Sequence, residues 1–181
     1  MLAQLSDLEP YLAKKPGDGD EPVFTALLTG VSAAIETYCS RVFALTDYVE
    51  TYDGNGARLL TLDHGPITAV ASLKIGADVI PAASQSGHGY AFRDAMLLLT
   101  GGLTFRRGIG LVTVAYSAGF ATVPADVTLA AVLWAAALYK ERSHLGQTSS
   151  GDGNSHASYA IQTMPPAARD ILNSWRAWRV T

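Results

Sequence analysis

Residues 48–70, YVETYDGNGARLLTLDHGPITAV, contain the side chains of this chain that are best suited to chemistry. Asp53, Asn55, Asp63 and His64 fall close together in this stretch. Carboxylate, amide and imidazole groups bind metal ions and hold substrates. Asp, Asn and Gly are also the residues that form turns in a β-sheet. The stretch therefore allows two interpretations, a functional site or turn chemistry.

The spacing of these residues favours turns. A calcium loop that begins at Asp53 would place Ala57, Arg58 and His64 where it needs an oxygen ligand, a glycine and a glutamate. Asp63 and His64 are adjacent, and adjacent side chains on a strand point to opposite faces. We therefore predict no catalytic residue and no metal ligand here. The segment GNG is interpreted as the turn of a hairpin between YVETYD and RLLTL, and DHGP as a second turn.

Two further candidate sites are also better explained as structure. GGLTFRRGIG places glycines around Arg106 and Arg107, but the β-like run LVTVAY follows it, whereas a phosphate-binding loop leads into a helix. It is interpreted as a hairpin tip with two exposed arginines. His144 and His156 flank a glycine-rich loop with no suitably spaced partner ligand. The sequence therefore predicts no cofactor and no enzymatic activity.

Length and composition describe an ordinary folded protein. The 181 residues suffice for one domain, or for a core with a small subdomain. The single Cys39 excludes an intrachain disulfide and is expected to behave as a small apolar residue. The first residues show no signal-peptide pattern, and the charge-free stretch 127–139 is too short to span a bilayer. We expect a soluble protein without a membrane partner.

Charge is divided unevenly along the chain. Residues 1–53 contain nine acidic and three basic side chains, whereas residues 54–181 contain seven acidic and ten basic ones. This division is too mild for a dedicated nucleic-acid-binding protein. It would suit head-to-tail packing of identical subunits, in which an acidic surface meets a basic neighbour.

Hydrophobic periodicity predicts an α+β fold, with a helical bundle core of about four helices and an inserted small antiparallel β-subdomain. Residues 22–41 have the apolar spacing of a helix, preceded by Asp20 as its N-cap, whereas the pattern alternates with a period of two from residue 47. The expected divisions are N-terminal core helices 1–46, β-subdomain 47–120, long core helix 121–145, flexible arm 146–164 and amphipathic C-terminal helix 165–181.

The long helix has no charged residue between Asp126 and Lys140, so it has no polar face through its middle. Such a helix is expected to be the central core helix or to face another subunit. The stripe of Trp175 and Trp178 in the last helix is expected to dock on the body of its own domain or, with three nearby arginines, to form an interface hot spot. The candidate interface residues are Arg106, Arg107, Arg142, His144, Arg169, Trp175, Arg176, Trp178 and Arg179.

Three ordered stretches carry a family resemblance: VSAAIETYCSRVFA, then YVETYDGNGARLLTLDHGPITAV, and later VTVAYSAGFATVPADVTLAAVLWAAALYKER. Over residues 6–145 the chain resembles the head–tail connector (adaptor) proteins of tailed bacteriophages and of related gene-transfer particles. The residues from 146 onward follow no pattern of that family.

The resemblance implies a structural virion protein at the head–tail interface, made in the cytoplasm of the bacterial host. It implies a homo-oligomeric ring, commonly of twelve copies, that docks beneath the portal protein after DNA packaging and receives a downstream tail or stopper protein. The segment from His144 onward would then contact the portal or neighbouring copies.

Two alternatives stay open. One is a DNA-contacting packaging or head-completion factor that acts through Arg106, Arg107 and the C-terminal arginines, with non-specific DNA contact in the lumen. The other is a small ligand-binding protein that uses a pocket in the β-subdomain.

Overall fold

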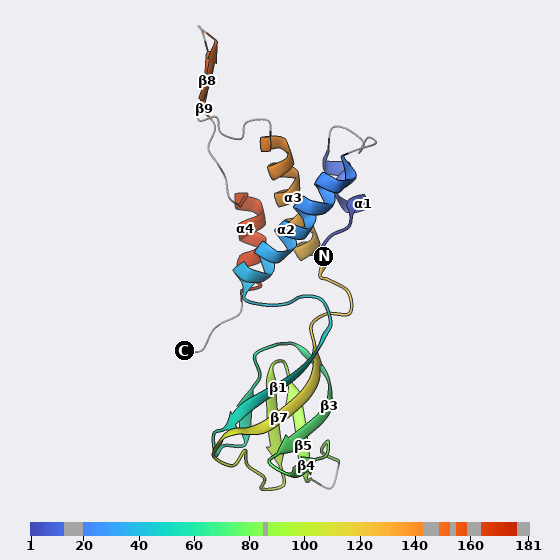
Figure 1. The fold of residues 1–181 in the computed structure, drawn as a ribbon, viewed down its shortest axis with the longest axis vertical. Coiled ribbons are helices and arrows are strands. Elements are labelled where there is room, and N and C mark those ends of the chain that lie inside the picture. The colour runs from blue at the N-terminus through green and yellow to red at the C-terminus, as the bar shows by residue number, and fades with distance from the viewer. Residues whose placement is uncertain (13–19, 85–86, 143–148, 153–154, 159–163, 177–181) are drawn as a thin grey trace. The chain divides into compact units, whose positions relative to one another are not determined.

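The computed structural model describes residues 1–12, 20–84, 87–142, 149–152, 155–158 and 164–176. The chain divides into two compact units (Figure 1). The helical unit combines residues Met1–Arg41 with Val123–Thr181, and the β-unit is formed by Val42–Thr122. The β-unit is therefore inserted between two parts of the helical unit.

The helical unit contains four α-helices and one short 3-10 helix among the described residues. Helix α3 packs against both α2 and α4, and α1 contacts α2 and α3. The elements are α1 (Leu5–Leu8), η1 (Glu9–Tyr11), α2 (Glu21–Cys39), α3 (Ala125–Glu141) and α4 (Pro166–Asn173).

Helix α2 forms as its periodicity predicts. Phe24, Leu28, Val31 and Ile35 recur at helical spacing and are almost fully buried. Asp20 occupies the N-cap position of this helix, as predicted, and makes no side-chain capping bond. Its carboxylate instead accepts a hydrogen bond from the Tyr139 hydroxyl at 3.2 Å.

Helix α3 is the central element of the helical unit. Its small side chains Ala130, Ala131 and Ala135 are fully buried, which lets neighbouring helices approach closely. Because α1, α2, α4 and η1 all contact it, the charge-free middle of α3 is largely accounted for by packing within the subunit. This outcome matches the first of the two alternatives expected for this helix.

The β-unit consists of two antiparallel sheets. The larger sheet has the strand order β1-β7-β3-β4 and the smaller one the order β2-β6-β5. The strands are β1 (Thr46–Gly54), β2 (Leu59–Thr61), β3 (Ile67–Ile75), β4 (Asp78–Ile80), β5 (Gly89–Arg93), β6 (Met96–Thr100) and β7 (Gly108–Ala118).

A single apolar core joins the two sheets. Leu73 and Val114 of the larger sheet and Leu97 and Leu99 of the smaller sheet belong to one cluster of fully buried side chains. Phe105, in the connection between the sheets, is also fully buried in this cluster. Alternation of buried and exposed positions along β7 aims one face of the strand into this core.

The predicted hairpin around GNG is wrong. Strand β1 pairs with β7, and β2 pairs with β6 in the other sheet. The turn therefore carries the chain from the larger sheet to the smaller one. The N–H of Gly56, in this turn, donates to the carbonyl of Phe105 at 2.6 Å. A Cβ on Gly54 would lie 1.6 Å from the carbonyl oxygen of Arg106, so glycine is required by close backbone approach.

The segment 101–110 is likewise not a hairpin tip. Strands β6 and β7 lie in different sheets, and the residues between them cross from one sheet to the other. Local sequence favoured a hairpin because glycines flank two β-like runs, but β6 pairs with β5 and β2, whereas β7 pairs with β1 and β3.

The predicted flexible arm is only partly described. Within it, β8 (Ser149–Asp152) and β9 (Ser155–Ser158) form a two-stranded antiparallel hairpin instead of an irregular loop. The C-terminal helix is shorter than predicted, because α4 ends at Asn173 and Trp175 follows it. Four α-helices and antiparallel sheets in one chain make the fold mixed α+β, as predicted.

The close approach at Gly54 generates a stability prediction. Gly54→Ala is expected to lower the free energy of unfolding by more than about 2 kcal/mol, because the added Cβ collides with backbone. Gly30→Ala is the matched control: nothing lies within 4 Å of a Cβ built there, so replacing this helical glycine should raise stability by about 1 kcal/mol. Thermal denaturation followed by circular dichroism measures both, and a stable Gly54→Ala protein would contradict the close approach.

Candidate functional site

The four residues of the suspected site do not converge. Asp53 accepts a hydrogen bond from the Gly110 N–H at 2.6 Å through its Oδ1. Asn55 accepts from the Ala57 N–H at 2.8 Å and donates to the Leu59 carbonyl at 2.9 Å. The Asn55 side chain therefore stabilises the turn between sheets, in agreement with the turn interpretation, whereas Asp53 links β1 to its neighbour β7.

Asp63 and His64 lie next to a different group of side chains. The backbone N–H of Asp63 donates to the Tyr52 hydroxyl at 3.0 Å. His64 places Nε2 3.3 Å from Glu50 Oε1, and its ring stacks on Tyr48 with 3.9 Å between centroids. Within the described residues, no group of three or more His, Cys, Asp or Glu side chains could hold a metal ion.

Glu50 is the centre of this arrangement. Its Oε2 accepts hydrogen bonds from the hydroxyls of Tyr116, at 2.6 Å, and Tyr52. Burial, followed by the hydrogen bond to Glu50, raises the pKa of Tyr52 to about 12. The same two causes raise the pKa of Tyr116 far above its ordinary value. Both hydroxyls therefore remain protonated donors at neutral pH.

This network connects three parts of the β-unit. Glu50 and Tyr52 lie on β1, Tyr116 lies on β7, and His64 lies in the turn before β3. The two tyrosine hydroxyls thus occupy the lone-pair sites of Oε2, one of the two oxygens of the Glu50 carboxylate. The arrangement is suited to holding the turn against the sheet, and none of its side chains is an activated nucleophile.

The pairing of Glu50 with Tyr116 has no signal in the sequence. They are 66 residues apart, and only the register of β1 against β7 brings them together. The one available signal was the alternation along β1, which places Tyr48, Glu50 and Tyr52 on the same face of the strand.

Arg106 is held by the β-unit itself. Its guanidinium lies 2.7 Å from the carboxylate of Asp78 and donates to the Ile75 carbonyl at 3.1 Å. Together with Leu103 and Thr104 these residues line a small surface hollow. Arg107 is exposed, and its side chain runs beside Gly56.

The C-terminal segment is attached to the helical unit by several polar contacts. Trp175 donates from Nε1 to Asp126 Oδ2 at 2.7 Å, and the Tyr38 hydroxyl lies 2.6 Å from Asn173 Oδ1. The guanidinium of Arg176 lies 5.3 Å from the ring centroid of Tyr38, whereas Arg169 is exposed. Trp175 thus docks on its own subunit.

The remaining candidates are divided between described and undescribed residues. The guanidinium of Arg142 lies 3.5 Å from the ring centroid of Tyr139 at the end of α3. His144, Trp178 and Arg179 lie outside the described residues.

Cys39 is fully buried, and burial raises the pKa of its thiol. It therefore stays uncharged and behaves as the small apolar residue that was expected.

Comparison with known proteins identifies the relatives of this fold. A family model described as head completion protein matches residues 3–178. The chain belongs to the head completion protein family. This membership confirms the interpretation of the protein as a structural virion component of the head–tail connection.

Solved structures share the fold of this head completion protein. The neck of an empty gene transfer agent (GTA) particle, computed with C6 symmetry, contains a chain with 21% identity and a TM-score of 0.63, covering 94% of this chain and 85% of that one. A chain in the virion of a native GTA particle has 22% identity and a TM-score of 0.62, covering 97% and 90%. A comparison with curated proteins gives no match.

A third similar structure is the neck of a native GTA particle computed with C12 symmetry. Its chain has 22% identity and a TM-score of 0.57, and the match covers 88% of the head completion protein and 84% of the GTA chain.

None of the helices in the described ranges is long and apolar enough to cross a membrane.

The tyrosine network generates a prediction for alkaline pH. Tyr52 ionises near pH 10 in the unfolded chain and near pH 12 in the folded one. The folded state therefore retains a proton that the unfolded state releases, and its stabilising contribution is complete below pH 10 and is lost between pH 10 and 12. We expect the free energy of unfolding, measured by denaturant titration, to fall over this interval.

Glu50→Gln tests the cause of that pH dependence. The substitution removes the charge that disfavours tyrosinate, so part of the tyrosine titration measured by absorbance at 295 nm should move to lower pH. An unchanged titration would show that Glu50 does not control the two tyrosines.

Proposed function

We propose that this head completion protein is an adaptor that forms a homo-oligomeric ring, docks beneath the portal after DNA packaging and links the capsid to the tail. The observation that supports this most strongly is the family match over residues 3–178. The neck chains of GTA particles, one of them in a neck computed with C12 symmetry, add support because they share the fold over most of both chains. Twelve copies per ring is the corresponding stoichiometry.

The proposed partners are the portal protein on the capsid side and a tail or stopper protein on the other side. The protein would be made in the host cytoplasm and would act at the head–tail interface of the particle. In this proposal the helical unit is the bundle-like body of each subunit, and the β-unit, at about residues 47–120, is an appended subdomain. The role is structural, with no catalysed reaction.

The C-terminal segment is the part proposed to engage the portal or a neighbouring copy. Arg169 and Arg176 are exposed, and the chain continues beyond them with Trp178 and Arg179. Tryptophan and arginine are the residues that most often dominate binding energy at interfaces. Arg106 and Arg107 are proposed as secondary contacts on the β-unit.

A binding experiment with the portal tests the proposed function. The full-length chain is mixed with the purified portal ring of its own particle, and native mass spectrometry measures the number of copies bound. We expect complexes that contain twelve copies of this chain. Nuclease treatment should leave them intact, whereas loss on treatment would favour the DNA-contacting alternative. Absence of any association would overturn the proposal.

A short truncation tests the C-terminal contacts. Removing residues 177–181 deletes Trp178 and Arg179 but retains α4 and the Trp175–Asp126 hydrogen bond. We expect portal affinity to fall by tenfold or more, the usual effect of losing a hot-spot tryptophan or arginine. Arg93→Glu, on a side chain that is 88% exposed in the β-unit, is the control and should bind normally. Equal affinity of the truncated and full-length chains would remove this segment from the interface.

A further inference from the structure

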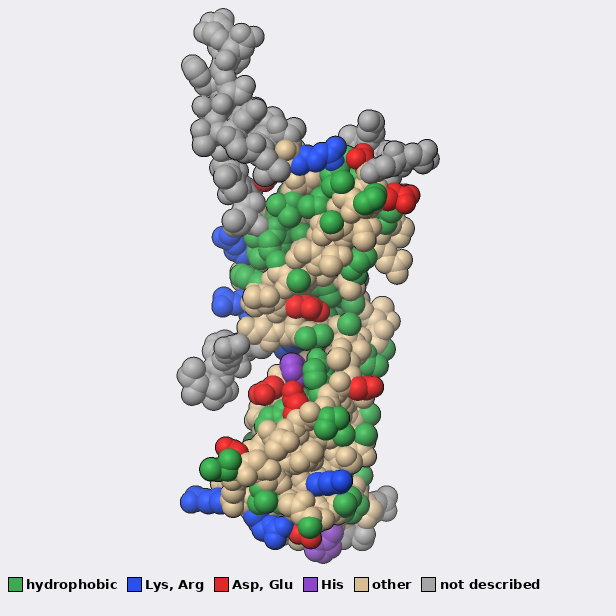
Figure 2. All heavy atoms as spheres, in the orientation of Figure 1, with side chains coloured by type: hydrophobic (Ala, Val, Ile, Leu, Met, Phe, Trp, Pro, Cys, Tyr) green, Lys and Arg blue, Asp and Glu red, His purple; other side chains and the backbone are tan. Residues whose placement is uncertain are grey.

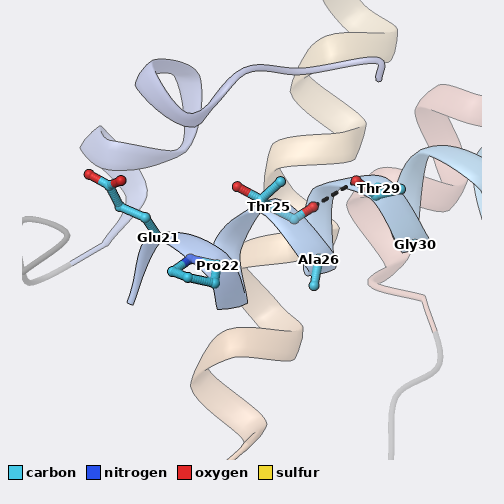
Figure 3. Close-up of a pocket in the computed structure, with 6 residues that line it drawn as sticks. All are labelled: Glu21, Pro22, Thr25, Ala26, Thr29 and Gly30. Carbon is cyan, nitrogen blue, oxygen red and sulfur yellow. Dashed lines mark hydrogen bonds between the residues drawn. The ribbon is translucent and has the colours of Figure 1, made fainter. Parts of the chain in front are cut away.

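One long surface of the helical unit is exposed among the residues that the structure describes. It runs along α2 and comprises exposed residues that recur every three or four positions, and it is called the outer face of α2 below. Figure 3 shows part of it, with a surface hollow lined by Glu21, Pro22, Thr25, Ala26, Thr29 and Gly30. Ala33 and Thr37 continue the exposed positions toward the end of the helix.

The outer face of α2 has an unusual composition for a solvated helix surface. No Lys, Arg, Asp or Glu occurs between Glu21 and Glu36. Figure 2 shows the corresponding band of uncharged side chains over α2, with acidic groups at its two ends. Exposed helix faces of soluble proteins normally carry many charged side chains. A surface of this length without them is typical of an interface core, which is depleted in charge.

The threonines on this face are arranged to present apolar groups. The Thr29 hydroxyl donates to the Thr25 carbonyl at 2.8 Å, and the Thr37 hydroxyl donates to the Ala33 carbonyl at 2.9 Å. Because each hydroxyl is directed back to the helix backbone, the methyl group remains for contact with a partner. The polar atoms of these two residues therefore need no partner from outside.

Gly30 supplies a second, independent anomaly. A glycine in a helix interior costs about 1 kcal/mol relative to alanine. In the described part of the chain nothing explains it, since no atom there lies within 4 Å of a Cβ built at Gly30. A glycine at an exposed helix position is explained if the backbone of another chain approaches closely there.

The spacing of this face also fits helix packing. Pro22, Ala26, Thr29 and Ala33 are separated by four, three and four residues, which is the seam along which one helix packs on another. With such small side chains, a partner helix can approach closely. Val23, 42% exposed at the edge of the seam, provides apolar contact area beside it.

Charge indicates what covers this surface. The N-terminal end of α2 carries the exposed Glu21, whereas two exposed arginines, Arg169 and Arg176, lie on the C-terminal segment. That segment contacts the other end of α2, where the Tyr38 hydroxyl donates to Asn173 Oδ1 at 2.6 Å. An exposed acidic group therefore lies near one end of α2, and the side near the other end, with the two arginines, is basic. Identical subunits with this arrangement complement each other head to tail, which is the contact that closes a ring.

We propose that the outer face of α2 is the surface on which a second copy of this chain docks, through its α3–α4 side. The inference rests on the proposed ring and names the subunit contact that builds it. The contact is heterologous: each copy offers α2 to one neighbour and the basic side to the other.

Ala26→Arg tests the contact. A long charged side chain at the centre of the seam should block docking while the isolated subunit folds normally, because position 26 is exposed. We expect the concentration needed for ring formation on the portal to rise at least tenfold, measured by native mass spectrometry. Ala91→Arg is the matched control, an exposed alanine on β5 of the β-unit, and should assemble like the wild type.

Photo-crosslinking identifies the occupant directly. With benzoylphenylalanine in place of Val23, illumination of concentrated full-length chain, with and without portal, should give crosslinks to residues 123–176 of another copy. Crosslinks to the portal alone, or an Ala26→Arg chain that assembles like the wild type, would overturn the inference while leaving the proposed ring intact.

If the proposed function fails, the wild-type chain itself does not bind the portal. In that case crosslinks between copies in solution would still support this contact, and their absence would reject it.

Discussion

The pairing of β1 with β7 is the interaction on which the architecture depends. These strands are the first and last of the β-unit, and their register begins at Thr46 opposite Ala118. A further bridge joins Ala44 to Phe120, so the two ends of the inserted unit leave it side by side. The chain therefore leaves the β-unit close to where it entered, although about eighty residues lie between α2 and α3. This removes most of the loop-closure entropy that a long insertion would add to the packing of α2 against α3.

The same pairing explains why certain motif residues are glycines. Gly54 and Gly119 lie in the stretches ETYDG and YSAGF that carry the family resemblance. A Cβ at Gly54 would collide with the Arg106 carbonyl, and one at Gly119 would lie 2.5 Å from the Ala44 carbonyl. At both positions two backbone segments touch where the chain enters or leaves a strand. The motifs thus mark close backbone approaches at the ends of the paired strands, so structure alone accounts for these two glycines.

Prediction from sequence succeeded where structure is set by local periodicity. The buried positions of α2 and the charge-free α3 follow directly from the spacing of apolar residues, and the alternating segments were recognised as strands. It failed where partners are distant. The glycines at 54–56 and at 101–102 resemble hairpin turns locally, but burial of Phe105 between two sheets decides the path of the chain. Glu50 and Tyr116 could not be paired without knowledge of the strand register.

The fully buried Cys39 has a practical consequence for studying this protein in its assembly. Its Sγ lies 3.8 Å from the Leu172 carbonyl, and it is the only thiol in the chain. A thiol that is enclosed and difficult to ionise reacts slowly with alkylating reagents and with oxidants. Any cysteine placed on the surface would therefore be the one reactive thiol of the subunit. Fluorescent labels and spin probes can then be attached at chosen positions without first replacing the native residue.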